Sequence, residues 1–219
     1  MVRNIKKLKV LLIAPLMDLP TITSNMGVLD ILDYASNRND LDIDYLWGVM
    51  ANRIAFNIAT KLKKYDAIFY WGHGKEVKLH GTHFFWSVIS KKNIYKAGNT
   101  PFDTMACLSA KELGKFAVAT GTKAYIGTTE LYYAAYPEKE RDFLADWIDY
   151  TTIRQKALLD GKTFGEAYDM FVDKISAYIK LYEGFGDYRN YDWYAEAARH
   201  NRKHTILIGD RNARLGFVK

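Results

Sequence analysis

The chain has 219 residues, of which 49% are hydrophobic and 26% are charged, and this balance is ordinary for a globular protein. Its formal net charge of +6 is spread along the chain without a long Lys/Arg block, so nucleic-acid binding is not expected. No apolar run approaches the ~20 residues that a membrane span requires, so no membrane partner is expected either.

In chain order, the first predicted element is a buried strand at residues 9–15, KVLLIAP, closed by Pro15. The run follows a basic start, but no small-residue cleavage site comes after it. We therefore interpret it as a strand rather than a signal peptide, and expect a cytoplasmic protein. A loop follows, and then a helix over about 26–35 with Ser24 or Asn25 as its N-cap.

The next predicted elements are a strand at LDIDYLW, a helix over 52–64, and a third strand, AIFYWG, which ends at His73. Residues 75–100 are polar and punctuated by glycine, and the short FFWSVI within them indicates a strand or an edge hairpin. FDTMACLSA predicts a further strand, and KELGKFAVATG predicts a helix that stops at Gly121.

KAYIGTTE predicts another strand, and residues 138–181 predict amphipathic helix broken near Gly161. The segment YEGFGDYRNYDWY reads as an aromatic loop, and HTILIG as the last strand. Strands and helices alternate throughout, which predicts one α/β domain over 1–219. We expect a mostly parallel six-stranded sheet with helices on both faces.

Cys107 is the only cysteine, which excludes an internal disulfide and a Cys-rich metal site. A lone cysteine is most often a small buried hydrophobe, so its neighbours decide whether it has a chemical role. His73 ends one predicted strand and Cys107 ends the next. The carboxyl ends of parallel strands meet at one edge, where a thiol and an imidazole can act as nucleophile and general base.

The residues around this pair favour the same chemistry. A helix beginning near Ala110 would point its positive end at Cys107 and favour the thiolate. Gly74 allows a tight turn after His73, so that the N–H groups of Gly74 and Cys107 could hold the oxyanion of a tetrahedral intermediate. Gly72 would let a substrate or a neighbouring chain pass close by.

Histidine before cysteine, each at a strand end, is the order found in caspase-like cysteine peptidases. AIFYWGHG and FDTMACLSA resemble the His-Gly and Ala-Cys blocks of the caspase–gingipain clan. ATGTKAYIGTTELYY, GKTFGEAYDMFVDK and ILIGDRNARLG are similar to later blocks of its gingipain and CHAT branch. Together these blocks cover roughly residues 9–15 and 66–215 in the right order.

The resemblance implies a caspase-hemoglobinase-like fold and a cysteine endopeptidase acting on a protein or peptide. It implies that His73 is the base, that Cys107 is the nucleophile, and that the amides of Gly74 and Cys107 form the oxyanion hole. It also implies that the substrate lies extended beside Thr128 and Thr129, pairing by strand addition.

The same resemblance places Tyr132 or Tyr133 near the S1 pocket, which receives the substrate side chain before the cleaved bond (P1). Met105 stands two positions before the cysteine, where several members that cleave after basic residues carry an acid. A basic P1 preference therefore lacks its simplest support, and Asp103 or Glu130 are the alternatives. The P1 residue stays open.

Two carboxylates, Asp18 and Glu76, are candidates for orienting His73, and the sequence does not choose between them. Because this partner and the S1 acid are both unassigned, the alternative function is a catalytically silent caspase-fold binding or scaffold protein. A different Cys-His acyl transferase is a third interpretation.

The histidines match no strong zinc spacing, and the chain contains neither a P-loop nor a G-x-G-x-x-G motif. We therefore expect no metal and no cofactor. The oligomeric state is not indicated by the sequence.

Overall fold

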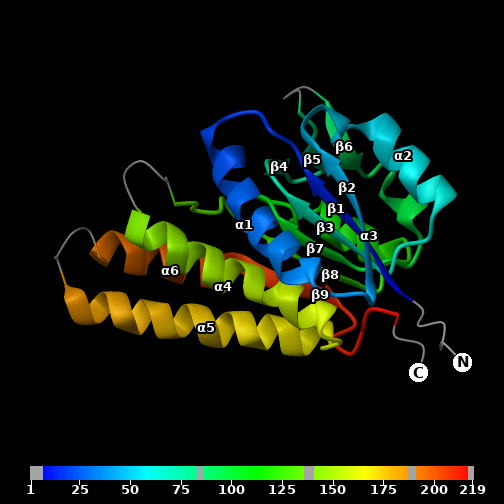
Figure 1. Cartoon of the computed structure of the whole chain (residues 1–219). Coiled ribbons are helices and arrows are strands. Elements are labelled where there is room, and N and C mark those ends of the chain that lie inside the picture. The colour runs from blue at the N-terminus through cyan, green and yellow to red at the C-terminus, as the bar shows by residue number, and fades with distance from the viewer. Residues whose placement is uncertain (1–6, 83–85, 136–140, 187–190, 217–219) are drawn as a thin grey trace, which may run out of the picture.

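The computed structural model describes residues 7–82, 86–135, 141–186 and 191–216 (Figure 1). A six-stranded sheet with the order β2–β1–β3–β7–β8–β9 forms its centre. The strands are β1 (Leu8–Ala14), β2 (Leu41–Trp47), β3 (Ala67–Trp71), β7 (Phe102–Met105), β8 (Ala124–Thr128) and β9 (Thr205–Gly209). β9 runs antiparallel to β8, and the other neighbours are parallel. The predicted α/β fold with a mostly parallel six-stranded sheet is confirmed.

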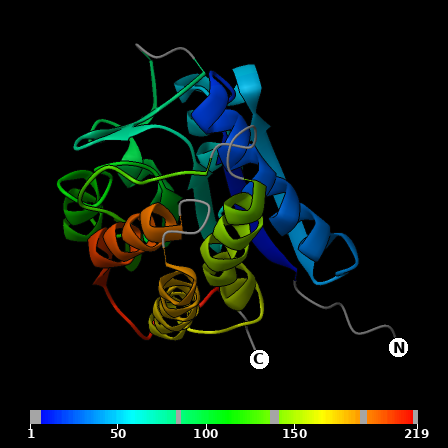
Figure 2. The ribbon, with the colours of Figure 1, turned by 90° about the vertical axis from the view of Figure 1, so that its left-hand side faces the viewer.

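Helices cover both faces of this sheet (Figure 1, Figure 2). One face carries α1 (Leu19–Ser36), α4 (Arg141–Leu159), α5 (Phe164–Phe185) and α6 (Tyr191–His204), and the other carries α2 (Arg53–Leu62) and α3 (Leu113–Ala119). Along β1, Val10 and Leu12 pack with the first group, whereas Leu11 and Ile13 pack with the second. This division explains why the strand is apolar at every position.

A small antiparallel sheet follows β3 in the chain. It consists of β4 (Gly74–Lys75), β5 (Lys78–His80) and β6 (Ser87–Ser90). Two short 3-10 helices, η1 (Gly48–Met50) and η2 (Ile94–Ala97), complete the described elements. β6 confirms a strand within FFWSVI, although residues 83–85 lie outside the described part of the chain.

The predicted start of the first helix is wrong. α1 begins at Leu19 and is capped by Asp18, not by Ser24 or Asn25. Pro20 suits the first helical turn because its missing N–H has no partner there, and the Ser24 hydroxyl donates back to the Pro20 carbonyl at 2.9 Å. The correction matters for the site, because the longer helix fixes Asp18 at its N-terminus.

Two further boundaries differ from the prediction. α3 begins at Leu113 rather than near Ala110. The aromatic stretch over 182–194, expected to be a loop, contains the end of α5 and the start of α6. The break near Gly161 between α4 and α5 is confirmed. Among the helices of the described residues, none is both long and apolar enough to cross a membrane.

Candidate active site

β3 and β7 are neighbours in the sheet, and the chain places His73 and Cys107 just beyond their carboxyl ends. In the parallel register, Trp71 lies opposite Met105, and these are the last residues of the two strands. His73 and Cys107 each follow two residues later in the chain. The N–H of Gly72 donates to the Met105 carbonyl at 3.0 Å and extends the pairing past β3. Both residues line one cavity at this edge of the sheet, as the positions of the two strand ends predicted.

The turn that carries His73 is held by several contacts. Its carbonyl accepts hydrogen bonds from the Tyr70 hydroxyl at 2.7 Å and from the N–H of His80 at 3.0 Å. A Cβ at Gly72 would lie 2.8 Å from the ring of Pro15, so the close approach of these two segments requires glycine. The imidazole is therefore presented from a well-anchored backbone.

Asp18 holds the imidazole ring, with its Oδ2 2.8 Å from Nε2 of His73. Its other oxygen, Oδ1, accepts the N–H of Thr21 and so caps α1. Partial burial would raise the pKa of the Asp18 carboxyl, but the hydrogen bonds with His73 and Thr21 outweigh it and lower this pKa below its ordinary value. The other candidate, Glu76, forms an ion pair with Lys111 at 2.8 Å.

Cys107 opens a tight loop between β7 and α3. The next residue, Leu108, has a φ of 58°, in the left-handed region that residues other than glycine seldom adopt. Its N–H donates to the carbonyl of Glu130 at 3.1 Å, and the N–H of Tyr132 points at the Cys107 sulfur at 3.3 Å. The nucleophile candidate is thus fixed against the segment that follows β8.

Burial raises the pKa of the Cys107 thiol, and the hydrogen bond from the Tyr132 N–H offsets this only in part. The expected help from a helix is missing, because α3 begins at Leu113 and has seven residues, after a run of turns. The prediction of a helix-stabilised thiolate is therefore wrong. The neutral thiol is the favoured resting form.

Gly74 packs directly on the loop of the nucleophile candidate. A Cβ at this position would lie 2.5 Å from the carbonyl oxygen of Cys107 and 2.9 Å from the Cβ of Ala106. Across β4 and β5, Gly74 pairs with Leu79. The two loops therefore touch, while the role of the Gly74 and Cys107 amides as an oxyanion hole stays a prediction.

A cavity of about 250 Å³ opens beside the pair. Met105, Tyr132 and Tyr133, which the sequence predicted near the substrate, all line it. Trp147 of α4 and Trp193 of α6 also line it, and neither was predicted. Trp147 lies in a segment predicted as amphipathic helix and Trp193 in a stretch expected to be an aromatic loop, and neither position carries a local signal for a substrate site. The remaining lining residues are Pro20, Thr21, Ser24, Gly72, Ala106, Leu131 and Ala134.

No carboxylate of the described residues lines this cavity. Asp103, a candidate for holding a basic side chain, is fully buried and bound by Arg154 at 2.9 and 3.0 Å. Gln155 donates a further hydrogen bond to it at 2.8 Å. Glu130, the other candidate, lies outside the lining. The structure therefore offers no carboxylate for a basic P1 residue here.

Thr128 and Thr129 are not part of the cavity lining. The buried Thr128 hydroxyl donates to the Ala106 carbonyl at 2.7 Å, and the Thr128 N–H binds the Ser109 hydroxyl at 3.3 Å. The Thr129 N–H donates to the carbonyl of His204 at 2.9 Å. Strand addition beside these two residues is therefore disfavoured, because the N–H groups that an extended substrate would need are already bonded.

No protein-family model matches the chain, and no curated protein matches it in sequence. Among solved structures, it is similar to the complex of Porphyromonas gingivalis RgpB pro- and mature domains, with a TM-score of 0.58 and 16% sequence identity. The match covers 97% of this chain and 51% of that one, so the chain spans about half the length of that structure. The likeness shows a caspase-like fold related to that of a gingipain, and at this identity it shows the fold alone.

Proposed function

We propose that the chain is a cysteine endopeptidase in which His73 and Cys107 carry the chemistry. The main supporting observation is that both line one cavity at the ends of adjacent strands, with Asp18 bound to the imidazole. A nucleophile, a base and a group that orients the base are the parts that covalent acyl transfer requires. The fold likeness to a gingipain is consistent with this proposal.

Because Asp18 holds Nε2, the thiol proton passes to Nδ1 of His73 as the sulfur attacks the scissile carbonyl. A C–S bond forms and the carbonyl oxygen becomes an oxyanion, for which the amides of Gly74 and Cys107 are the proposed donors. The C–N bond then breaks, and His73 returns the proton to the leaving amine. An acyl-enzyme thioester remains on Cys107.

Water completes the cycle. His73 takes a proton from a water molecule as its oxygen attacks the thioester, the C–S bond breaks, and the sulfur regains a proton as the acid product leaves. The raised pKa of Cys107 makes proton transfer during attack, rather than a standing thiolate, the way in which this sulfur is activated.

We assign the cavity beside the pair to the P1 side chain and propose that it selects an apolar or aromatic residue. Met105, Trp147 and Trp193 contribute apolar walls, and no Asp, Glu, Lys or Arg side chain of the described residues lines it. A lysine or arginine P1 side chain would lose its hydration there without gaining a carboxylate partner, and an acidic one would meet only the imidazole that the reaction uses.

The test is a fluorogenic peptide library varied at P1, incubated with the wild type, Cys107→Ala and His73→Ala. We expect cleavage after large apolar residues that both substitutions abolish. Cleavage of an identified substrate that survives Cys107→Ala would overturn the proposal.

A binding or scaffold protein is the second candidate. The raised pKa of Cys107 and the bonded N–H groups of Thr128 and Thr129 favour it. A panel of peptidyl chloromethyl ketones with apolar, basic and acidic P1 residues separates the two candidates by mass spectrometry. Alkylation of Cys107 that depends on the P1 residue and on His73 supports the peptidase, and no alkylation of the folded protein supports the scaffold.

A further inference from the structure

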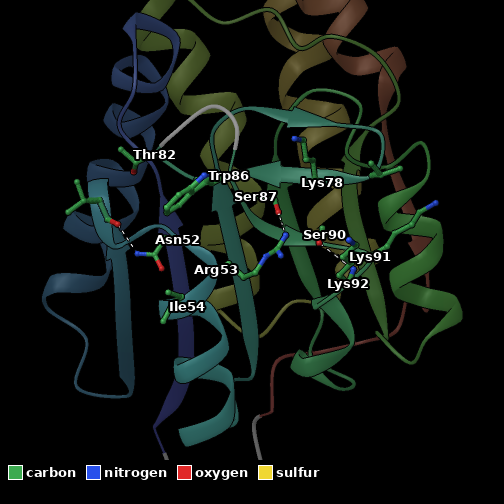
Figure 3. Close-up of a pocket in the computed structure, with 13 residues that line it drawn as sticks. Asn52, Arg53, Ile54, Lys78, Thr82, Trp86, Ser87, Ser90, Lys91 and Lys92 are labelled. Carbon is green, nitrogen blue, oxygen red and sulfur yellow. Dashed lines mark hydrogen bonds between the residues drawn. The ribbon is translucent and has the colours of Figure 1, made fainter.

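A second and larger hollow, which we call the hairpin groove, lies between the start of α2 and the β5–β6 hairpin (Figure 3). Its volume is about 870 Å³. In the view of Figure 3, Trp86 and Ile54 lie on one side, Lys91 and Lys92 lie on the other, and Arg53 reaches between them toward Ser87. The groove thus has an apolar end and a cationic end.

The charge of the lining is entirely positive. Arg53, Lys78, Lys91 and Lys92 contribute to it, and no acidic side chain of the described residues does. Lys91 is partly neutralised by Glu112, 2.6 Å away. Lys78 and Lys92 form no ion pair within the described part of the chain, so they supply positive charge that an anionic partner could meet.

Arg53 is held in place in the middle of the groove. Its Nη2 donates to the Ser87 hydroxyl at 2.6 Å, so the guanidinium keeps its charge while its position is set by β6. It is also the first residue of α2, where the helix dipole adds a positive contribution. An acidic group at the centre of the groove would therefore meet a pre-positioned cation.

The apolar end is unusually open to solvent. Val49, Ile54 and Trp86 are 72%, 71% and 64% exposed, although they gather around one hollow. Exposed apolar side chains that cluster in this way mark interaction sites. A small ligand on the floor of the groove would leave these walls in water, whereas a chain segment would cover them.

We propose that the hairpin groove docks an acidic peptide segment of a partner protein. An apolar side chain of that segment packs on Trp86 and Ile54, and its carboxylates face Arg53, Lys78 and Lys92. A second copy of this chain fits less well, because each copy carries a net charge of +6. The proposal does not depend on the peptidase reaction.

The test is fluorescence anisotropy of the full chain with a fluorescein-labelled ten-residue peptide of Asp and Glu that contains one Phe and one Leu. We expect saturable binding that weakens as salt rises. The double variant Lys78→Glu/Lys92→Glu should weaken binding about tenfold or more, because each reversal turns an attraction into a repulsion. Trp86→Ala, at an exposed position, should weaken it through the loss of apolar contact.

A matched control makes the same charge change elsewhere. Lys123→Glu/Lys180→Glu alters two exposed lysines outside the groove and should leave the affinity within about twofold of the wild type. Equal losses in the two double variants would mean that only net charge matters, and would overturn the proposal. Absence of saturable binding, or equal binding of a peptide in which Asn and Gln replace the acids, would also overturn it.

Two measurements address other occupants. If sodium tripolyphosphate displaces the labelled peptide with an inhibition constant as low as the peptide's own dissociation constant, the groove is a small-anion site and the proposal is overturned. Self-association of the wild type in sedimentation velocity, lost in Lys78→Glu/Lys92→Glu, would identify a second copy as the occupant and overturn it as well. A peptide partner is supported only when tripolyphosphate does not displace the probe in this way and the wild type does not self-associate through the groove.

Discussion

Asp18 and His73 lie 55 residues apart in sequence, and the structure brings Oδ2 of the carboxylate to 2.8 Å from Nε2 of the imidazole. The contact joins the start of α1 to the end of β3, two elements on the carboxyl edge of the sheet. Because Oδ1 of the same carboxylate caps α1, the geometry of the helix sets the orientation of the ring.

Asp18→Asn should therefore lower kcat/KM for a cleaved peptide by about tenfold to a hundredfold, because the imidazole loses a partner for its protonated form. Asparagine is also a good N-cap, so the free energy of unfolding in urea should change little. Glu76→Gln is the matched control, since that carboxylate pairs with Lys111. Unchanged kcat/KM in a folded Asp18→Asn would show that Asp18 does not orient the base.

Alkylation of Cys107 by iodoacetamide should be slow at neutral pH and should accelerate only above the range of an ordinary thiol. Burial raises the pKa of Cys107, so at any given pH the folded protein holds less thiolate than the unfolded chain. Cys107 is the only cysteine, so the label reports on one site. In urea, the alkylation profile should move to lower pH, toward that of a free thiol.

Rapid labelling of the native protein well below pH 8 would contradict this account. If His73→Ala abolished that labelling, the cause would be an ion pair between the thiolate and the imidazolium in the resting protein. The imidazolium, rather than burial, would then determine the pKa of Cys107.

Trp193→Ala should shift the P1 preference. Trp193 is 44% exposed at the rim of the cavity, so its truncation opens the P1 site with little expected loss of folding stability. We expect a loss of kcat/KM for small apolar P1 residues and a relative gain for the largest aromatic ones, measured with the same library. Trp86→Ala, which removes a tryptophan of the hairpin groove, should leave the P1 profile unchanged. An Arg or Lys preference in the wild type would contradict the apolar assignment without challenging the His73–Cys107 chemistry.

Arg154→Met should destabilise the fold by about 3–5 kcal/mol, because it leaves Asp103 buried without its ionic partner. The double variant Asp103→Leu/Arg154→Met should recover part of that loss, since no buried charge is left alone. Urea unfolding of the three proteins gives both differences. Arg199→Met, at an exposed ion pair with Glu183, is the control and should change stability little. If Arg154→Met were as stable as the wild type, the prediction would be wrong, and Asp103 would then be protonated in the folded variant.

The sequence alone determined the sheet and the two chemical candidates. Continuous apolar runs such as residues 9–15 and the alternation of strands and helices required a mostly parallel sheet covered on both faces. His73 and Cys107 follow two such strands directly, so their shared edge could be predicted from local patterns. The tight turn expected at Gly74 was wrong: Gly74 is the first residue of β4 and pairs with Leu79, and the tight turn of this segment lies at residues 76–77.

Only the tertiary structure decided which groups surround them. The partner of His73 is the N-cap of α1, in a stretch whose proline and hydroxyl residues predicted a loop. The helix includes these residues because side chains such as Ser24 donate their hydroxyl groups to carbonyls of the same helix. The acidity of Cys107 depends on how deeply the sulfur is buried, and burial is a property of packing that no local pattern expresses. Asp103 is not available to a substrate because Arg154, 51 residues away in sequence on α4, pairs with its carboxylate. Contacts between residues far apart in sequence therefore determined the chemistry of the site, while local patterns determined where it lies.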